Sequence, residues 1–341
     1  MSIVKTEWGK LSDGRSVSLF TLDNGQGVTA RISDYGGVIQ SLRTPDRNGK
    51  PGEIGLGFEQ LEQYIAKRKY YGALVGRVAN RIRAGRFTLD GREHQLWVAP
   101  NGIHLHGGQV GFNSKLWTSS IENDKVRLDY LSPDGEEHYP GNLKVSVWYS
   151  LVGQDLILEY EATTDKPTIV NLTNHIFFNL NCCERDVLAH EIRIQADAYT
   201  PIDSGLVPTG EILPVAGTPL DFTTAKAIGR DLQDIPAGYD HNFIFNKTDG
   251  ITYETLVDVY DPDTGRTLAM ATSEPCTQFY TGNFLNGSDV GIDGKAFRHR
   301  YGFCLEAQKH PDAINHPNFA NVVLRVGETY RQMTVYRFGT R

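Results

Sequence analysis

The chain has 341 residues, of which 40% are hydrophobic and 22% charged, and it carries a formal net charge of −7. This balance excludes bulk disorder and argues against nucleic-acid binding, which needs a basic surplus. The 35 glycines, 16 tyrosines and 15 phenylalanines, against 3 methionines, favour a turn-rich β protein over a helical bundle.

Alternating apolar residues predict strands along most of the chain. The first clear case is Val28, Ala30 and Ile32, which alternate with polar neighbours until Asp34-Tyr35-Gly36-Gly37 interrupts them. Turns are expected at five dipeptides, namely Asn24-Gly25, Asn48-Gly49, Asp90-Gly91, Asp134-Gly135 and Asn286-Gly287.

The segment 145–160 predicts a β-hairpin. Its apolar residues from 145 to 151 share one face, a turn is expected at Gly153-Gln154-Asp155, and the alternation resumes from 156 to 160. Helical character is limited to residues 59–65 and 223–228, each enough for one or two turns. We therefore expect an all-β fold, a large antiparallel β-sandwich with few short helices.

Nothing in the sequence divides the chain into two units. It contains no Pro/Ser linker, charge run or internal repeat, so we expect one domain over residues 1–341. No apolar run is long enough to span a membrane, and residues 1–11 lack the apolar core of a signal peptide. We therefore expect a cytoplasmic protein.

The four cysteines do not indicate a disulfide framework. Cys182 and Cys183 are adjacent and cannot pair easily with each other. Cys276 and Cys304 lie in strand-like runs, where cysteine usually behaves as a small buried hydrophobe.

Histidines are the first candidates for chemistry. His104 and His106 flank Leu105, and in a strand both rings would point to the same face. Such a pair could ligate a metal, bind a polar ligand or have a purely structural role, and spacing does not choose between them.

The segment 171–180 places polar side chains among apolar ones. Thr173, Asn174 and His175 lie next to two phenylalanines, and buried polar groups need partners. His175 could act as a general acid, because imidazole titrates near neutral pH. It could equally be a core histidine bonded to the backbone.

Two carboxylates complete the candidate set. Glu306 lies inside the apolar run 303–307, and burial would raise its pKa and make it a stronger base once ionised. Asp240, just before His241, is either a second acid or the cap of a turn.

Six segments follow one another in an order that resembles the aldose 1-epimerase (galactose mutarotase) family. The similarity extends from about Gly25 to Tyr336. The segments are Gly76-Arg77-Val78-Ala79-Asn80-Arg81-Ile82, Leu105-His106-Gly107-Gly108, Thr173-Asn174-His175, Asp240-His241-Asn242, Gln278-Phe279-Tyr280-Thr281-Gly282-Asn283-Phe284 and Leu305-Glu306-Ala307-Gln308, with Pro311-Asp312 beyond.

The resemblance implies a supersandwich fold with an open sugar cleft and an isomerase that interconverts the α and β anomers of free hexoses such as galactose and glucose. Glu306 would be the general base and His175 the general acid. The sugar would be held by Asn80, Arg81, His106, Asp240 and Gln278. No metal and no cofactor are implied, and the expected partner is the sugar, for a monomer or homodimer. We further expect Asp240 to lie near His175 and to keep its imidazolium charged.

The chain departs from the family pattern at four positions that bear on sugar preference. Leu172 replaces a common proline, and Ile176 replaces a serine that would carry a hydroxyl beside the acid. His138 stands where glycine is common, and His310 lies at a variable position near the expected cleft rim.

Three other functions fit parts of the same residue set. A cupin-type metalloenzyme could use His104, His106, His175 and Glu306, although cupins place their glutamate soon after the histidine pair. A non-catalytic sugar-binding protein would keep the cleft, and a glycosidase would pair Glu306 with Asp240.

Overall fold

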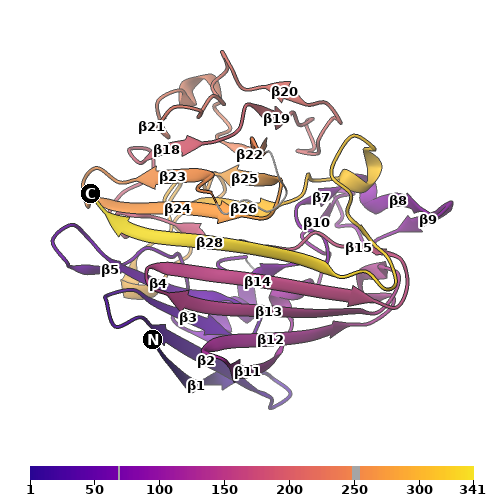
Figure 1. Cartoon of the computed structure of the whole chain (residues 1–341), viewed down its shortest axis with the longest axis horizontal. Coiled ribbons are helices and arrows are strands. Elements are labelled where there is room, and N and C mark those ends of the chain that lie inside the picture. Colours follow the sequence, from indigo (N-terminus) through magenta and orange to yellow (C-terminus); the bar gives the residue numbers. More distant parts are fainter. Residues whose placement is uncertain (68–69, 248–253) are drawn as a thin grey trace.

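A nine-stranded antiparallel sheet forms one face of the molecule (Figure 1). The structure is a computed structural model, and it describes residues 1–67, 70–247 and 254–341. In spatial order, the sheet contains β11 (Thr118–Glu122), β12 (Lys125–Ser132), β13 (Leu143–Val152), β14 (Asp155–Thr164), β28 (Tyr330–Thr340), β24 (Arg266–Thr272), β23 (Val257–Tyr260), β18 (Glu191–Ile194) and β21 (Lys226–Ala227).

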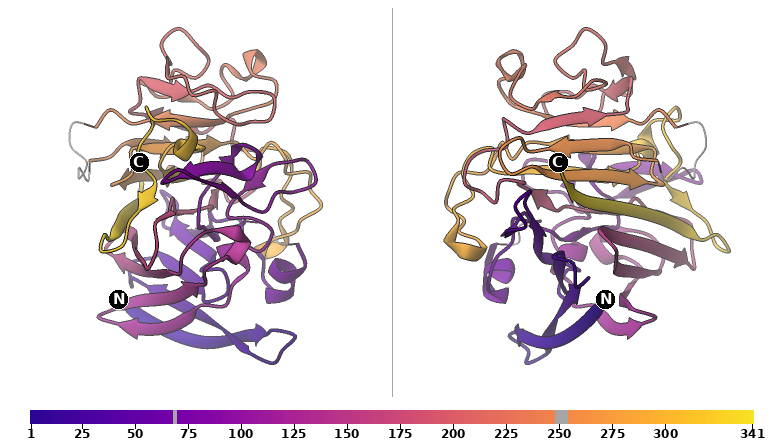
Figure 2. Two further views of the ribbon diagram at one scale, coloured as in Figure 1. Left: turned by 90° about the vertical axis from the view of Figure 1, so that its right-hand side faces the viewer. Right: turned by 60° about the vertical axis from the view of Figure 1, so that its left-hand side comes forward.

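Two smaller antiparallel sheets lie behind it and form the second layer, as the side views show (Figure 2). The six-stranded sheet contains β17 (Phe177–Phe178), β26 (Phe303–Gln308), β25 (Cys276–Tyr280), β22 (Asp240–Ile244), β19 (Ala198–Thr200) and β20 (Leu213–Pro214). The five-stranded sheet contains β1 (Ser2–Lys10), β2 (Ser16–Asp23), β3 (Thr29–Ser33), β4 (Ile39–Pro45) and β5 (Pro51–Glu53).

Short strand pairs and single helical turns complete the fold. The pairs are β6 (Leu74–Val75) with β16 (Thr173–Asn174), β7 (Arg81–Ile82) with β10 (His104–Leu105), β8 (Arg86–Leu89) with β9 (Arg92–Gln95), and β15 (Thr168–Ile169) with β27 (Val323–Leu324). The described helical segments are α1 (Leu61–Lys67) and the 3₁₀ turns η1 (Arg83–Gly85), η2 (Phe112–Ser114), η3 (Glu136–His138), η4 (Leu232–Asp234), η5 (Ile292–Gly294) and η6 (Ala313–Asn315). None of these helices has the length and apolar character needed to cross a bilayer.

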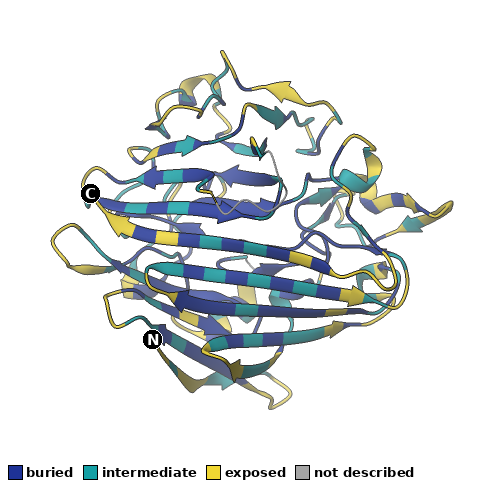
Figure 3. Ribbon diagram, viewed as in Figure 1, coloured by how far each residue is buried: buried dark blue, intermediate teal, exposed yellow. Residues whose placement is uncertain are grey.

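The core lies between the two layers. Along β14 and β28 every second side chain is buried, which appears as alternating bands in Figure 3. A single cluster of buried apolar side chains includes Phe20 of β2, Leu158 of β14 and Leu305 of β26, so it joins all three large sheets. The all-β sandwich predicted from the alternation is confirmed.

The predicted hairpin and turns are confirmed as well. Val152 pairs with Asp155, so Gly153 and Gln154 form a two-residue loop between β13 and β14. Gly153 has φ 58°, a conformation that glycine adopts without steric strain. The glycines of all five predicted Asx-Gly turns also have positive φ.

The strand β28 links the two layers near the middle of the molecule. It pairs with β14 on one side and β24 on the other. Its side chains also reach the opposite layer: the Tyr336 hydroxyl donates to the Leu305 carbonyl at 3.1 Å, and the Gln332 amide donates to the Ala307 carbonyl at 3.1 Å. These two bonds fix β26 on either side of Glu306.

One of the two predicted helices is wrong. The helix expected at 59–65 is present as α1, displaced by two residues. Residues 223–228 form no helix: the Asp221 carboxylate accepts from both the backbone N–H and the hydroxyl of Thr223, which makes a turn. The chain then enters β21, whose Lys226 is buried against the Pro219 carbonyl and Asp231.

A buried arginine holds the segment that leads into the site. Arg77 is 2% exposed, and its guanidinium donates to the carbonyls of Ser132, Pro133 and Pro140 and to the Ser132 hydroxyl. It also lies over the Tyr139 ring, 5.6 Å from its centroid. The planar fork of arginine matches several acceptors at once, which a lysine could not do.

We expect Arg77→Met to destabilise the protein by about 3 kcal/mol or more, because it leaves buried carbonyls without donors. Urea unfolding measures the effect. Arg331→Met is the matched control: its ion pair with Glu161 is at the surface, where such pairs contribute up to about 1 kcal/mol. Equal losses in the two variants would contradict this role for Arg77.

Candidate active site

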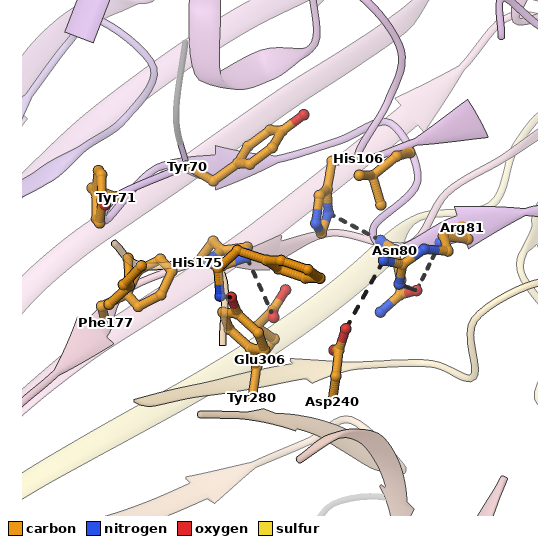
Figure 4. A pocket seen from close by; sticks show the side chains of 13 residues that line it. Tyr70, Tyr71, Asn80, Arg81, His106, His175, Phe177, Asp240, Tyr280 and Glu306 are labelled. Carbon is orange, nitrogen blue, oxygen red and sulfur yellow. Dashed lines mark hydrogen bonds and ion pairs between the residues drawn. The ribbon is translucent and has the colours of Figure 1, made fainter. Parts of the chain in front are cut away.

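A cavity of about 270 Å³ opens beside the six-stranded sheet (Figure 4). Six of the seven predicted site residues line it: Asn80, Arg81, His106, His175, Asp240 and Glu306. The rest of its wall is mostly aromatic and aliphatic, formed by Tyr70, Tyr71, Leu105, Phe177, Tyr280, Phe284 and Leu285. Mostly apolar walls with a few convergent polar groups are typical of small-molecule sites.

Asn80 and His106 are joined by two hydrogen bonds, one between backbone atoms and one from the backbone to the imidazole ring. The His106 N–H donates to the Asn80 carbonyl at 2.9 Å, and the Asn80 N–H donates to His106 Nδ1 at 3.2 Å. Because Nδ1 accepts, the neutral ring carries its proton on Nε2. Burial, and then the charges of His175 and Arg81, lower the pKa of His106 well below its ordinary value. His106 therefore acts as a neutral hydrogen-bond donor.

Gly107, which follows His106, makes this contact possible. Gly107 has φ +86°, and a Cβ there would lie 1.8 Å from the Gly76 carbonyl oxygen. Any larger residue would push the 104–108 turn away from the segment that carries Asn80.

Glu306 lies in the middle of β26 and is 2% exposed. Among the described residues, its Oε2 has no hydrogen-bond partner. Burial, and then the charge of Asp240, raise the pKa of the Glu306 carboxyl well above its usual range, while Arg81 opposes the shift. The site therefore holds a carboxyl group with an oxygen free to accept from a ligand.

His175 follows β16 and precedes β17, and it faces Glu306. Its Nε2 lies 3.6 Å from Glu306 Oε1. The Tyr70 ring stacks on the imidazole at 5.7 Å between centroids, and the Phe177 ring contacts it at 5.0 Å. Burial lowers the pKa of His175 to about 4, although its own backbone carbonyl favours the charged form. Burial thus favours the neutral state of both members of the pair.

Asp240 does not contact His175, so the prediction that it keeps the imidazolium charged is wrong. Its Oδ2 lies 3.9 Å from Arg81 Nη2, and its Oδ1 accepts from the Gln278 amide at 2.7 Å. Electrostatically, Asp240 acts on Glu306 instead. Asn80 Oδ1 accepts from the Arg81 backbone at 2.9 Å, so Asn80, Arg81 and Asp240 form one polar wall of the cavity.

Gln278 is the one predicted site residue that is not among the described lining residues. It pairs with Glu306 across β25 and β26 and is 3% exposed, behind Asp240. Its amide orients the Asp240 carboxylate, so any effect on a ligand passes through Asp240.

His104 and His106 do not share a face, which corrects the expectation from their spacing. The strand β10 ends at Leu105, and His106 has φ 50°, so the alternation stops there. His104 is fully buried with its ring nitrogens 2.6 Å from the Trp97 carbonyl and 2.6 Å from the Tyr139 hydroxyl. Its role is structural.

Three of these side chains also meet the geometric requirement for a metal ion. One ligand atom from each of His106, His175 and Glu306 lies within 4.8 Å of the others. His104 lies outside this trio, so the four-residue cupin set is not assembled.

Several lining residues were not predicted. Phe177, Tyr280 and Phe284 fall within or beside the sequence motifs, but aromatic residues in strands usually belong to the core. Phe284 is 72% exposed at the cavity, which no sequence pattern indicated. Tyr70 has no motif of its own, and only the folded chain brings it against His175.

We expect both site histidines to be neutral at pH 6, with the His106 proton on Nε2. Burial lowers both pKa values, and the Asn80 N–H occupies His106 Nδ1. Nitrogen-15 NMR of histidine-labelled protein measures charge and tautomer, and the His106→Asn and His175→Asn variants assign the signals. An imidazolium spectrum for either ring at pH 6 would contradict the burial argument.

Comparison with known proteins agrees with this geometry. Residues 18–337 match the family model for aldose 1-epimerase. Rat galactose mutarotase is 43% identical over 99% of both chains, and aldose 1-epimerase of Escherichia coli K12 is 37% identical over 96% of both. The crystal structure of an aldose epimerase homologue from C. elegans has a TM-score of 0.89 at 29% identity, covering 95% of this chain and 99% of that one. The chain belongs to the aldose 1-epimerase family.

Proposed function

We propose that the protein is an aldose 1-epimerase that interconverts the anomers of free hexoses such as galactose and glucose. The observation that carries the proposal is the facing pair of His175 and Glu306, 3.6 Å apart in a cavity of about 270 Å³. An imidazole and a carboxyl group so placed can take one proton and give another within a single bound sugar. The galactose mutarotase and aldose 1-epimerase relatives support the same activity.

Ring opening needs two proton transfers. Glu306, as carboxylate, takes the proton from the C1 hydroxyl, and the electrons of that O–H bond form the carbonyl. The bond between C1 and the ring oxygen breaks, and the imidazolium of His175 gives its Nε2 proton to that oxygen. The C1–C2 bond then rotates, and closure on the other face of the carbonyl reverses both transfers.

The proton count of the pair explains why burial suits this reaction. Opening converts carboxylate and imidazolium into carboxylic acid and imidazole, and closure restores them. The neutral form is the one that burial favours for each group, as the opposite pKa shifts of Glu306 and His175 indicate. The dry site therefore stabilises the state that coexists with the open-chain sugar.

The remaining polar side chains are proposed to hold the sugar. His106 Nε2–H, the Arg81 guanidinium and the Asn80 amide can donate to sugar oxygens, whereas Asp240 accepts from hydroxyls. Gln278 contributes by orienting Asp240. This alternation of donors and acceptors around one wall suits a polyhydroxylated ring.

We also propose that residues 1–341 act as one domain. The site draws on segments from Asn80 to Glu306, and β28 pairs with strands from both halves of the chain. The described lining residues all come from one chain, and we propose that the active form is a monomer or a homodimer. A cytoplasmic location stays a prediction.

Polarimetry on freshly dissolved α-D-glucose and α-D-galactose tests the function directly. We expect acceleration over the spontaneous rate, and about a hundredfold or greater loss of kcat in Glu306→Gln and in His175→Asn, the usual scale for acid–base groups. Glu161→Gln and His299→Asn are matched controls outside the cavity.

Absence of acceleration for either sugar would defeat the claim for that sugar. A near-wild-type rate in either site variant would defeat its assigned role. Loss of activity in chelator, with stoichiometric metal in the active protein, would favour a metal-dependent reaction at His106, His175 and Glu306 instead.

The pH profile of kcat/KM follows from the single proton that the pair must hold. As the pH falls, His175 takes up a proton, and the pair then holds two protons instead of one. Burial places the pKa of His175 at about 4. As pH rises, Glu306 loses the shared proton, at a pKa raised well above the usual carboxyl range. We expect activity to persist below pH 6 and to decline toward pH 4, with circular dichroism confirming the fold. A decline of kcat/KM centred at about pH 6.5, the ordinary imidazole pKa, would contradict the proposed protonation of the pair.

A further inference from the structure

The side chain behind His175 is a cysteine. Cys304 lies two residues before Glu306 on β26, so both side chains point to the same face of the sheet. Its Sγ lies 3.5 Å from His175 Nδ1, on the opposite side of the ring from Glu306. Cys304 is fully buried and is not among the described residues that line the cavity.

The aromatic neighbours of the imidazole cannot distinguish its edges. Tyr70 stacks on its face, and Phe177, His106 and Tyr280 contact it through their rings. Aromatic contacts fix the plane of an imidazole, but a half-turn of the ring would exchange Nδ1 with a carbon and leave those contacts almost unchanged. A polar partner at Nδ1 makes the two orientations unequal, and only one of them directs Nε2 to Glu306.

A thiol suits this position because His175 changes charge during the reaction. A thiol is both a weak donor and a weak acceptor. Its sulfur can accept from Nδ1–H while the ring is charged. After Nε2 has given up its proton, the neutral ring keeps the proton on Nδ1, and the sulfur still accepts from it. A carboxylate at Nδ1 would stabilise the imidazolium strongly and weaken it as an acid. Burial, and then the charges of Glu306 and Asp240, raise the pKa of the Cys304 thiol, so it remains uncharged.

We propose that Cys304 is a positioning residue that orients the imidazole of His175 through Nδ1, so that Nε2 stays directed at Glu306 and the sugar ring oxygen. Cys304 touches no substrate and transfers no proton. This positioning role rests on the proposed epimerase function and adds one residue to it.

Cys304→Ala and Cys304→Ser separate orientation from packing. Alanine removes the thiol contact at Nδ1, whereas serine keeps a group that both donates and accepts. We expect kcat to fall roughly tenfold or more in Cys304→Ala, since small misplacements of catalytic groups are costly, with KM within about twofold because no sugar contact is lost. Cys304→Ser should recover most of the lost kcat.

Cys276→Ala is the matched control. Cys276, on β25, is also fully buried in the same sheet, and like Cys304 it is not among the described residues that line the cavity. Its register partner is Gln308, whereas Cys304 contacts His175. The Cys276→Ala variant should lose about as much thermal stability as Cys304→Ala, but its kcat should not fall. Wild-type kcat in Cys304→Ala, or equal loss of kcat in the serine and alanine variants, would overturn the proposal.

Nitrogen-15 NMR of the His175 ring gives a readout that is independent of turnover. Removing the thiol should change the Nδ1 signal of His175 and leave that of His106 in place. If the wild-type protein failed to accelerate mutarotation but the His175 signal still responded, the proposed function would be wrong and the positioning contact right. An unchanged His175 signal in Cys304→Ala would overturn the positioning role itself.

Discussion

The proposed reaction depends on removing one carboxyl group and one imidazole from water while leaving a single proton to be shared between them. Glu306 and His175 are both almost fully buried, and burial shifts their pKa values in opposite directions, toward two neutral groups. In water at about pH 6.5, the same groups would be a solvated carboxylate and a half-protonated imidazole, and the charge of one would depend little on that of the other. The aromatic wall and the β-sandwich behind it keep both side chains buried beside the cavity.

The surrounding structure keeps the pair in place with contacts that reach across the two layers. Tyr336 and Gln332 bind the carbonyls on either side of Glu306, and Arg77 holds the segment that carries Asn80 and Arg81. These are hydrogen bonds to backbone atoms rather than to the reacting side chains. A rigid frame of this kind leaves Glu306 Oε2 without a hydrogen-bond partner among the described residues.

Local patterns in the sequence were enough to predict the strands, the 145–160 hairpin and the burial of Glu306, because each depends on neighbours along the chain. Six of the seven proposed site residues do meet in one cavity. What could not be predicted depends on contacts between distant segments. Arg77 and Arg81 belong to one motif, yet one supports the fold and the other faces the cavity. Likewise, the partner of Asp240 is Arg81 rather than His175, and a left-handed residue ends the alternation at His106.

The central place of β28 has a consequence for biosynthesis. Residues 330–340 leave the ribosome after every other strand described here, yet β14 and β24 have no common neighbour until they arrive. Until then a nascent chain exposes the long edge of β14, and β26 lacks the two side chains that fix it. Final assembly of the sheet therefore waits for the last of the described strands, and the exposed edge is the part of the growing chain that a chaperone would need to protect.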